Sequence, residues 1–376
     1  MNKFWPLLFV TILALATWTT HYVQMTSASA GKPLATFETL SGDEAHLHDV
    51  ILEGSFVNRS SYARLVVENG EVYPRTQPFL TSSYLQVFED LKKQHRSFMR
   101  GKTNSTNQFY MHNDTIAYVN SMGEQGATHI DMTFGVKGAH NTSFTVDIPI
   151  DEKISWTTTY RLTLQGEAAY VLVNVMLENG KEALYGIELN IPEKQLVSAK
   201  KLVEVMDEGE LDYFISFISE SYTMQHEDYF VYVEGQYKHQ YNEGDSYTHS
   251  EEVHVWNTLT NTEAVFKLPE RLQAEERRIV TKGKLLLINI IRDGNIVTER
   301  YDLDAQKWLE PIVVNVSSDI YAQPYFSVTT SEQYMYTSIM TDEGTMLAII
   351  DPNTGNTVYT GMLNESLSIF YAMEQQ

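Results

Sequence analysis

Apolar and polar residues alternate along most of the chain beyond Pro33, with the two-residue period of strands that bury one face. From Tyr160 to about Val203, four such segments follow one another, with turn-forming residues between them: YRLTLQG, AAYVLVNVML, EALYGIELNI and QLVSAKKLV. Groups of four recur before and after this stretch at intervals of roughly 40 to 60 residues, a spacing typical of four-stranded propeller blades. The sequence therefore predicts an all-β protein built from a repeated four-stranded unit.

The two ends of the chain predict how this array closes. The last segment, SLSIFYAM at Ser366 to Met373, is a single strand, whereas HDVILEGSF, YARLVVEN and EVYPRTQ near the start form three strands that lack a first. Pairing these segments would complete one sheet from both termini and remove the open sheet edges. We therefore expect residues 45–376 to form a six-bladed β-propeller, with seven blades as the alternative count.

Short polar segments separate the third and fourth strands of several units. Between Leu347 and Leu363, the run Asp-Pro-Asn-Thr-Gly-Asn interrupts two apolar segments. Proline presets one turn dihedral and glycine readily takes a positive φ, so this run predicts a tight turn. Residues 257–261 and 302–306 occupy the same place in their units. The Asp-x-Asn-x-Gly spacing also resembles the start of a calcium loop, but the downstream bidentate glutamate is missing.

The N-terminus carries a segment of a different kind. After Lys3, the apolar run from Phe4 to Val23 reaches the roughly 20 residues that a membrane-spanning helix needs, and Lys3 would remain inside. The alternative is an export signal that is cleaved after Ala30, which would make the protein secreted. We expect residues 1–30 to be a signal anchor or signal peptide and residues 31–44 a linker. Either way, the bulk of the chain is expected to be extracytoplasmic, at the cell membrane.

One internal segment has helical periodicity. Ser83 and Gln86 have the spacing of a capping box, and apolar residues then recur every three or four positions. The second half of the segment is basic in an otherwise acidic chain, with Lys92, Lys93, Arg96 and Arg100. This pattern predicts an inserted amphipathic helix whose charges are solvated. The alternative is a docking surface for an acidic partner or for anionic lipid headgroups.

Charge and composition exclude several classes of function. The chain has 27 basic and 49 acidic residues among 376, a formal net charge of -22, which repels phosphate backbones and argues against a nucleic acid partner. The absence of cysteine excludes disulfides, thiolate metal sites and cysteine nucleophiles. The chain has no Gly-x-Ser-x-Gly elbow, phosphate-binding loop, dinucleotide fingerprint or His-Glu-x-x-His motif. No cofactor is predicted, and the motifs make no case for an enzyme.

The repeated units resemble those of membrane-anchored, extracytoplasmic bacterial β-propeller proteins, over roughly residues 45 to 373. The resemblance is one of fold alone. Trp-Asp dipeptides, paired glycines of the kelch kind and a pyrroloquinoline-type signature are absent, so no catalytic residue carries over. The resemblance implies a ligand at one mouth of the central channel, where loops between second and third strands converge with loops between blades.

The best candidate for such a loop runs from Tyr237 to Glu252. Long loops with polar and aromatic tips are frequent binding sites, and tyrosine offers sugars or peptides both an apolar face and a hydroxyl group. The alternative is a solvent-exposed hairpin tip without function. The predicted ligand-binding residues are His239, Tyr241, Asp245, Tyr247 and His249.

A weaker candidate for metal binding precedes the first predicted strand. In a strand, His46 and His48 would point the same way, as two metal ligands must. The sequence identifies no third ligand. The alternative is an ordinary polar segment.

These observations favour a non-catalytic binding or sensing module that is tethered to the cell membrane and recognises a protein, a peptide or a cell-wall glycan. The first alternative is a glycan-active hydrolase or lyase on a propeller scaffold, with carboxylates near the channel. The second is a scaffold for the assembly of other surface proteins. Histidines and carboxylates gathered at one end of the channel would favour an enzyme, whereas an extended apolar outer surface would favour a scaffold.

Overall fold

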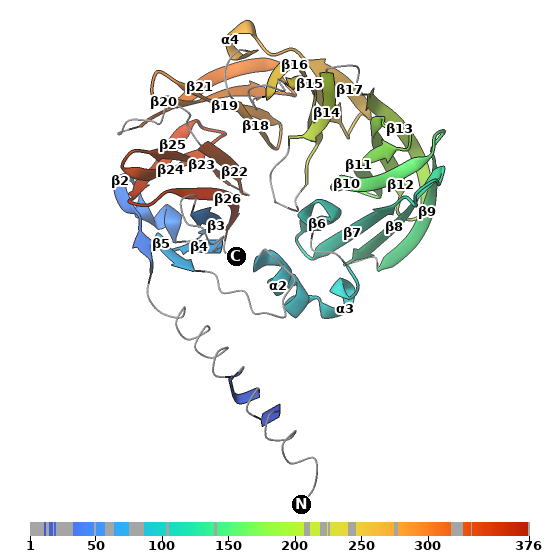
Figure 1. Ribbon diagram of the computed structural model, residues 1–376, viewed down its shortest axis with the longest axis horizontal. Helices are drawn as coiled ribbons and strands as arrows, with labels where there is room; N and C mark the ends of the chain where they lie inside the picture. Colours follow the sequence, from blue (N-terminus) through green and yellow to red (C-terminus); the bar gives the residue numbers. More distant parts are fainter. Residues whose placement is uncertain are drawn as a thin grey trace, which may run out of the picture.

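The computed structural model describes residues 11–12, 15–17, 19, 33–48, 50–56, 64–74, 86–102, 105–138, 141–206, 211–218, 224, 226–239, 246–273, 277–316, 326–331 and 333–374. Over these residues the fold is all-β, with six antiparallel sheets of four or five strands. Figure 1 shows the sheets following one another around a common centre in the order of the sequence. The short helices are η1 (Glu44–Leu47), α2 (Gln86–Gln94), α3 (Arg96–Met99), η2 (Thr106–Gln108) and α4 (Glu270–Gln273).

Four of the sheets are simple four-stranded meanders of consecutive strands. Sheet II contains β6 (Phe109–His112), β7 (Thr115–Met122), β8 (His129–Lys137) and β9 (Thr142–Pro149). Sheet III contains β10 (Ile154–Gln165), β11 (Ala168–Leu177), β12 (Glu182–Asn190) and β13 (Gln195–Val205). Sheet IV contains β14 (Leu211–Phe217), β15 (Tyr229–His239), β16 (Ser246–Asn257) and β17 (Thr262–Phe266). Sheet V contains β18 (Arg277–Lys282), β19 (Leu285–Arg292), β20 (Asn295–Asp302) and β21 (Lys307–Asn315).

The other two sheets combine strands from both ends of the chain. Sheet VI contains β22 (Phe326–Thr330), β23 (Met335–Thr341), β24 (Gly344–Asp351) and β25 (Asn356–Leu363), with β2 (Glu38–Gly42) on its outer edge. Sheet I has the order β1 (Ala35–Thr36), β5 (Glu71–Pro74), β4 (Arg64–Glu68), β3 (Val50–Phe56) and β26 (Leu367–Glu374). Residues predicted to form a linker before residue 45 therefore supply two edge strands, because β1 pairs with β5 and β2 with β25.

The pairing of β26 with β3 confirms that the two ends of the chain share one sheet, as predicted from the sequence. Leu367 lies opposite Phe56, and the antiparallel register continues to Glu374 opposite Val50. The last strand of the chain thus becomes the edge strand of the sheet that the first long strands begin, and it lies toward the centre in Figure 1. Sequence segments more than 300 residues apart are joined by backbone hydrogen bonds, roughly one per residue pair.

The hydrophobic core is divided among the junctions between neighbouring sheets. Separate clusters of buried apolar side chains join sheets II and III, III and IV, IV and V, V and VI, and VI and I. On its other face, sheet II packs against α2 and α3 through Phe88, Leu91 and Met99. Inner strands such as β23 are buried on both faces, whereas an outer strand such as β13 alternates with solvent. Each sheet is therefore stabilised by its neighbours, as in repeat architectures.

One close contact shows how tightly sheets III and IV fit together. The Trp256 side chain is fully buried, and a Cβ atom added at Gly186 of β12 would lie 2.8 Å from the indole ring. Gly186 therefore provides the space that Trp256 fills. The indole Nε1 donates a hydrogen bond to Asn261 at 3.1 Å. Trp256 lies on the same face of β16 as His254, which belongs to the candidate site described below.

Four turns between third and fourth strands share one hydrogen-bond pattern. In each, a side-chain oxygen accepts a backbone N–H from two or three residues later at 2.9 Å, and the residue four positions after it has a positive φ. The turns begin at Asn190, Asn257, Asp302 and Asp351 and have their positive φ at Lys194, Asn261, Gln306 and Gly355. The three turns predicted from the sequence are confirmed, and the fourth follows the same rule.

Replacing Asp302 by alanine should lower the free energy of unfolding by about 1–2 kcal/mol, because the N–H groups of Asp304 and Ala305 lose their acceptor. Asp302→Asn keeps an acceptor and should cost less. The Ala305 N–H, and after it Lys284, hold the pKa of Asp302 below its ordinary value of 3.8. The charge of Asp302 therefore stabilises the fold above that value and loses this effect as the pH falls through the lowered pKa.

Urea unfolding at pH 7 and near pH 3 tests this prediction for wild type, Asp302→Asn and Asp302→Ala. The difference between wild type and Asp302→Asn should shrink in acid, while the cost of Asp302→Ala should persist in part. An asparagine variant as unstable as the alanine variant at both pH values would contradict the proposed role of the acceptor.

The predicted amphipathic helix is present in two pieces. Helix α2 ends at Gln94, His95 is non-helical, and α3 continues from Arg96. The predicted capping residue Ser83 lies outside the described residues. Most of residues 1–30 also lie outside them, and within the described part of the chain no helix is both long and apolar enough to cross a membrane.

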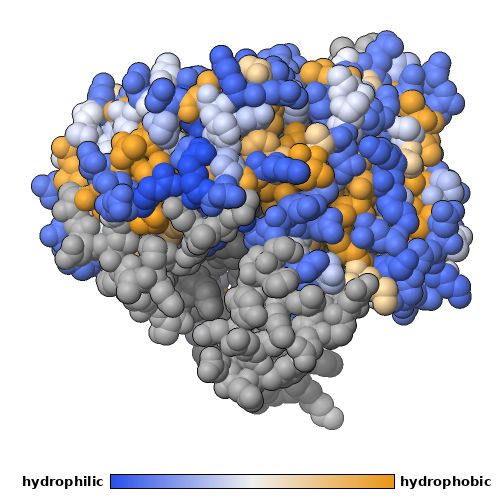
Figure 2. Space-filling view, turned by 90° about the horizontal axis from the view of Figure 1, so that it is seen from above, coloured by the Kyte–Doolittle hydropathy of each residue, from blue (hydrophilic) through white to orange (hydrophobic). Residues whose placement is uncertain are grey.

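On the face shown in Figure 2, hydrophilic side chains cover most of the described surface, and hydrophobic residues lie in patches between them. Exposed large apolar side chains come from several sheets, among them Met122, Trp156, Val197 and Val313. This mixed surface is ordinary for a folded protein.

Candidate functional site

The β15–β16 hairpin carries the residues that the sequence assigned to ligand binding. His239 ends β15 and pairs with Ser246, the first residue of β16. Tyr247 and His249 lie on β16, because strand pairing continues further into the predicted loop than expected. Tyr241 and Asp245 lie outside the described residues. His239 and Tyr247 thus lie at the same end of the hairpin. Ligand binding by these residues stays a prediction.

Strand β16 continues beyond the end of its outer neighbour β17. The pairing of these two strands ends at Val253 opposite Phe266, so among the described residues 246–252 of β16 pair only with β15. In a four-stranded meander, the turn between second and third strands lies at the opposite end from the other two turns. The extension of β16 is therefore at the end where the sequence placed the ligand.

Two glutamates and a histidine gather at the root of this hairpin. Glu234 of β15 lies directly opposite Glu252 of β16, and His254 follows two residues later on the same face of β16. The His254 Nε2 atom is 3.6 Å from Glu234 Oε2 and 4.0 Å from Glu252 Oε2. The side chain of His254 is 9% exposed, whereas that of Glu252 is 66% exposed. We refer to Glu234, Glu252 and His254 as the hairpin-root cluster.

Side chains other than the two glutamates also contact His254 and position its imidazole ring. Glu263 of β17 places Oε1 3.3 Å from His254 Nδ1. The Tyr232 ring stacks on the imidazole, with 4.9 Å between centroids and 8° between planes, and its hydroxyl donates to Glu263. Lys200 of the neighbouring sheet III lies 3.5 Å from the other oxygen of Glu263. The imidazole is thereby fixed with Nδ1 toward Glu263 and Nε2 toward the hairpin-root glutamates.

The two carboxyl groups on either side of His254 have different proton affinities. Burial raises the pKa of Glu234, and the charges of Glu252 and Glu263 raise it further against the opposing effect of His254. Burial also acts to raise the pKa of Glu263, but the adjacent His254 imidazole and the hydrogen bond from Tyr232 outweigh it and leave that pKa below its ordinary value. Glu263 is therefore the carboxyl group that keeps its charge more readily.

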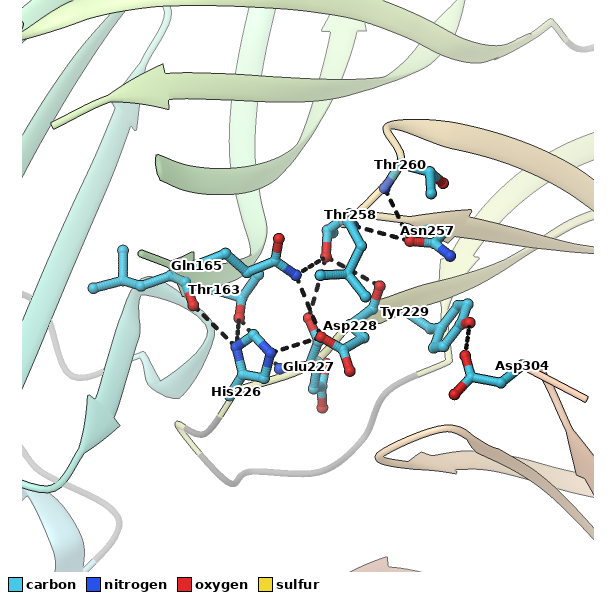
Figure 3. A network of polar contacts seen from close by, with 12 residues as sticks. Thr163, Gln165, His226, Glu227, Asp228, Tyr229, Asn257, Thr258, Thr260 and Asp304 are labelled. Carbon is cyan, nitrogen blue, oxygen red and sulfur yellow. Dashed lines mark hydrogen bonds and ion pairs between the residues drawn. The ribbon is translucent and has the colours of Figure 1, made fainter. Parts of the chain in front are cut away.

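A second polar network lies at the opposite end of the sheets, near the turns between first and second and between third and fourth strands (Figure 3). Gln165 of β10 donates hydrogen bonds to Asp228 at 3.3 Å and to Thr258 at 3.0 Å. Tyr229 donates to Asp304 of sheet V. The network thus joins residues of sheets III, IV and V, and these residues form hydrogen bonds mainly with one another.

Thr163, His226 and Asp228 in this network have the order of a hydroxyl–imidazole–carboxylate triad. Thr163 Oγ1 is 3.2 Å from His226 Nδ1, and Asp228 Oδ1 is 2.7 Å from Nε2. In a triad the imidazole nitrogen facing the hydroxyl accepts its proton. Here Nδ1 also lies 2.9 Å from the Leu164 carbonyl oxygen, which only accepts hydrogen bonds. Both ring nitrogens of His226 thus face oxygen atoms of neighbouring residues, and these contacts orient the imidazole.

A buried ion pair stands beside this network. Arg161 Nη2 lies 2.9 Å from Glu227 Oε1, and their side chains are 0% and 8% exposed. Arg161 belongs to β10 of sheet III, whereas Glu227 lies two residues before the start of β15 of sheet IV. The pair therefore connects two neighbouring sheets.

The structure corrects the backbone expected at His46 and His48. His46 lies in the 3₁₀ helix η1 and His48 caps it, so strand alternation does not direct the two rings to one side. The ring of His46 packs edge-on against Tyr334, with 5.2 Å between centroids. Metal binding by these two histidines stays a prediction, without the strand geometry on which it was based.

The basic residues of the predicted docking surface lie on and between the two short helices. Lys92 and Lys93 are in the last turn of α2, Arg96 begins α3 and Arg100 caps it. Lys93 lies 3.6 Å from Asp90, an exposed pair of the kind that contributes little to stability. Docking through these residues stays a prediction.

Sequence reasoning missed the hairpin-root cluster, although one signal was present. Glu252 and His254 are two residues apart in an apolar, alternating segment, a spacing that predicts a shared strand face. Glu234 and Glu263 come from two other strands, and only the register of pairing shows that they face His254.

Comparison with known proteins identifies neither a family nor a function for this chain. No family model matches the chain, and no curated protein matches it in sequence. Among solved structures, an apocarotenoid oxygenase/RPE65 chimera is 8% identical, with coverage of 93% of this chain and 97% of that one and a TM-score of 0.45. The Dos1 propeller is 10% identical, with 65% and 59% covered and a TM-score of 0.29. The polysaccharide lyase Uly1 is 11% identical, with 65% and 57% covered and a TM-score of 0.35.

The sheet topology by itself makes the chain an all-β protein whose six antiparallel sheets follow one another around a common centre.

Proposed function

We propose that this chain is a non-catalytic binding module, built on a six-bladed β-propeller that residues 1–30 tether to the cell membrane. The six sheets, the apolar clusters between them and the pairing of β26 with β3 support the blade count. The apolar run from Phe4 to Val23 supports a membrane anchor with the propeller outside the cytoplasm. Cleavage after Ala30 would release the same module as a secreted protein.

The observation that carries the proposal is the β15–β16 hairpin, which holds the predicted residues His239, Tyr247 and His249. Its β16 strand extends past β17. The carboxyl groups of Glu234 and Glu252 lie at the root of the hairpin, and the chain as a whole is acidic. A peptide or cell-wall glycan with basic groups complements this charge. At the other end of the sheets, the network around His226 is occupied by its own internal hydrogen bonds.

Binding to the hairpin can be tested with the full chain in detergent, immobilised and exposed to soluble cell-wall glycan fragments and to synthetic basic peptides. We expect one class to bind, and Tyr247→Ala combined with His249→Ala to weaken that binding at least tenfold. Asn353→Ala, in the turn between β24 and β25 at the opposite end, is the matched control and should bind as wild type. Equal affinity for wild type and the hairpin variant would overturn the proposed binding site.

A second candidate function is favoured by one observation. Glu234 and Glu263 lie on either side of His254, and their pKa values move in opposite directions, as in acid and base pairs of glycan-active enzymes. A hydrolase or lyase would release shortened glycans, which mass spectrometry of the incubated fragments detects. Glycan cleavage that Glu234→Gln abolishes would replace the binding module with this enzyme, whereas unchanged fragments support the binding module.

A further inference from the structure

We propose that the hairpin-root cluster is a divalent transition-metal site, in which His254 Nε2 and the carboxylates of Glu234 and Glu252 bind a zinc-type ion and Glu263 positions the imidazole. The inference concerns the ion alone, so it is independent of the larger ligand proposed above. It depends on three features of the cluster: ligand spacing, the surroundings of the buried nitrogen, and charge.

The spacing of the three ligand atoms suits a shared ion. One ligand atom from each of Glu234, Glu252 and His254 lies within 4.8 Å of the others. The 3.6 and 4.0 Å separations of Nε2 from the two carboxylate oxygens are too long for hydrogen bonds. Two ligands that bind one tetrahedral zinc ion at about 2.0–2.2 Å are roughly 3.3–3.6 Å apart. The two separations from Nε2 therefore exceed this range by at most a few tenths of an ångström.

The buried nitrogen of His254 points independently to a ligand. Neither ring nitrogen makes a regular hydrogen bond among the described residues, although the side chain is more than nine-tenths buried. Nδ1 has Glu263 at 3.3 Å, whereas Nε2 lies farther from both glutamates of the cluster. A buried polar atom without a partner is costly and rare in native proteins. Nε2 faces the two glutamates, so an ion bound between them would use the nitrogen lone pair.

Charge gives a third reason. Glu234 and Glu252 are directly opposite each other on adjacent strands, where like charges destabilise a sheet. A divalent cation neutralises both carboxylates. The alternative counter-charge is a proton on His254, and a metal titration separates the two, because only a metal site gives a defined stoichiometry.

The environment of Nδ1 matches the support that metal-binding histidines usually have. Such histidines present the other ring nitrogen to a carboxylate or carbonyl group, which fixes the tautomer and the ring orientation. Glu263 Oε1 occupies this place at 3.3 Å from Nδ1, and Tyr232 and Lys200 hold Glu263 in turn. Glu263 is therefore a positioning residue, and Glu252, at 66% exposed, leaves a route for the ion from solvent.

The ligand set selects the class of ion. Imidazole favours zinc and its neighbours over calcium and magnesium, which prefer ligand sets composed of oxygen atoms. Three protein ligands leave at least one coordination position for water or another molecule. We therefore expect Zn²⁺ and Co²⁺ to bind in preference to Ca²⁺.

The experiment titrates the full chain in detergent with zinc chloride by calorimetry, after dialysis against a chelator. We expect one ion per chain and a melting temperature that rises by about 3–6 °C at one hundred times Kd. His254→Gln should weaken binding at least a hundredfold and Glu252→Gln at least tenfold. Glu263→Gln should weaken it about 10- to 100-fold. Calcium chloride should give no comparable heat.

A matched control is available on sheet II, where His129, Asp131 and Asp147 form the other three-ligand group of the described residues, all three exposed on β8 and β9. Asp131→Asn combined with Asp147→Asn should leave the affinity and stoichiometry unchanged. Visible bands of bound Co²⁺ should disappear with His254→Gln and persist in this control. Because Glu252 is largely exposed, Glu252→Gln should fold normally, which near-UV circular dichroism checks. Absence of stoichiometric zinc binding, or binding that survives Glu252→Gln but not the control substitutions, would overturn the proposal.

Discussion

A chain that ends at Asn364 should fail to form a stable, cooperatively folded protein. It would lack β26, whose Leu367 and Ile369 are 0% and 2% exposed in the cluster between sheets VI and I. Removal of two buried aliphatic side chains costs about 5 kcal/mol or more, comparable with the whole stability of a typical domain. The truncation also removes the partner strand of β3 and exposes its edge.

Strand β26 is also tied to sheet VI, which makes the expected loss larger. Thr345 of β24 accepts the backbone N–H of Leu367 at 2.7 Å, and Ser327 of β22 donates to the Ile369 carbonyl oxygen at 2.6 Å. Thr345 would lose these contacts with residues 365–367, whereas Ser327 would keep its contact with Ser338 at 2.7 Å. The truncated chain should therefore lose its cooperative thermal transition, which calorimetry measures.

A peptide of residues 365–376 added in trans should restore part of that transition, because an extended segment can add to an open sheet edge. The matched control is removal of Gln375 and Gln376 alone, which leaves β26 complete and should melt as the full chain does. A scrambled peptide should have no effect. A truncated chain with the melting temperature of the full chain would show that terminal pairing does not stabilise the ring.

Removing one charge of the Arg161–Glu227 pair should cause the second largest loss of stability. Arg161→Met leaves Glu227 as a charge that is 8% exposed and has lost its 2.9 Å partner, which should cost about 3–5 kcal/mol. Glu227→Gln leaves the opposite charge and should cost a similar amount. Because the pair joins sheets III and IV, urea unfolding should report the loss as a shift of the global midpoint without a change in slope.

The double variant Arg161→Met with Glu227→Gln distinguishes a pair effect from a packing effect. It should be more stable than the sum of the single changes predicts, because neither buried charge is then present. The exposed pair Lys93 and Asp90 is the matched control, with an expected coupling of about 0–0.5 kcal/mol. A coupling for Arg161 and Glu227 as small as that of the control would contradict the assigned role.

Prediction from the sequence worked where a signal was local or periodic. Alternation identified the repeated strands, and the side-chain acceptors at Asn257, Asp302 and Asp351 identified turns because their hydrogen bonds reach only two or three residues along the chain. The unpaired last strand predicted closure, since a strand needs a partner wherever it lies in the sequence. Residues 35–42, predicted as a linker, lacked a long alternating pattern, and their strands form only because β5 and β25 offer open edges.

The same argument about two residues on one strand face failed at His46 and His48 and would have succeeded at Glu252 and His254. At His46, Asp43 accepts the N–H of Ala45 and starts a 3₁₀ helix, so the two-residue period does not apply. At His254, the strand is continuous and the face is shared. Periodicity predicts a shared direction only after the backbone conformation is known.

The sequence by itself determined the all-β class, the repeated four-stranded unit, the turn chemistry and the pairing of the two ends, because each depends on residue spacing or on a strand that lacks a partner. Only the tertiary structure decided which residues meet across strands and sheets. Glu234, His254 and Glu263 belong to three strands, and Arg161 and Glu227 to neighbouring sheets, so their contacts depend on register and on sheet packing. Register is set by how the whole sheet buries its side chains, which no short stretch of sequence contains.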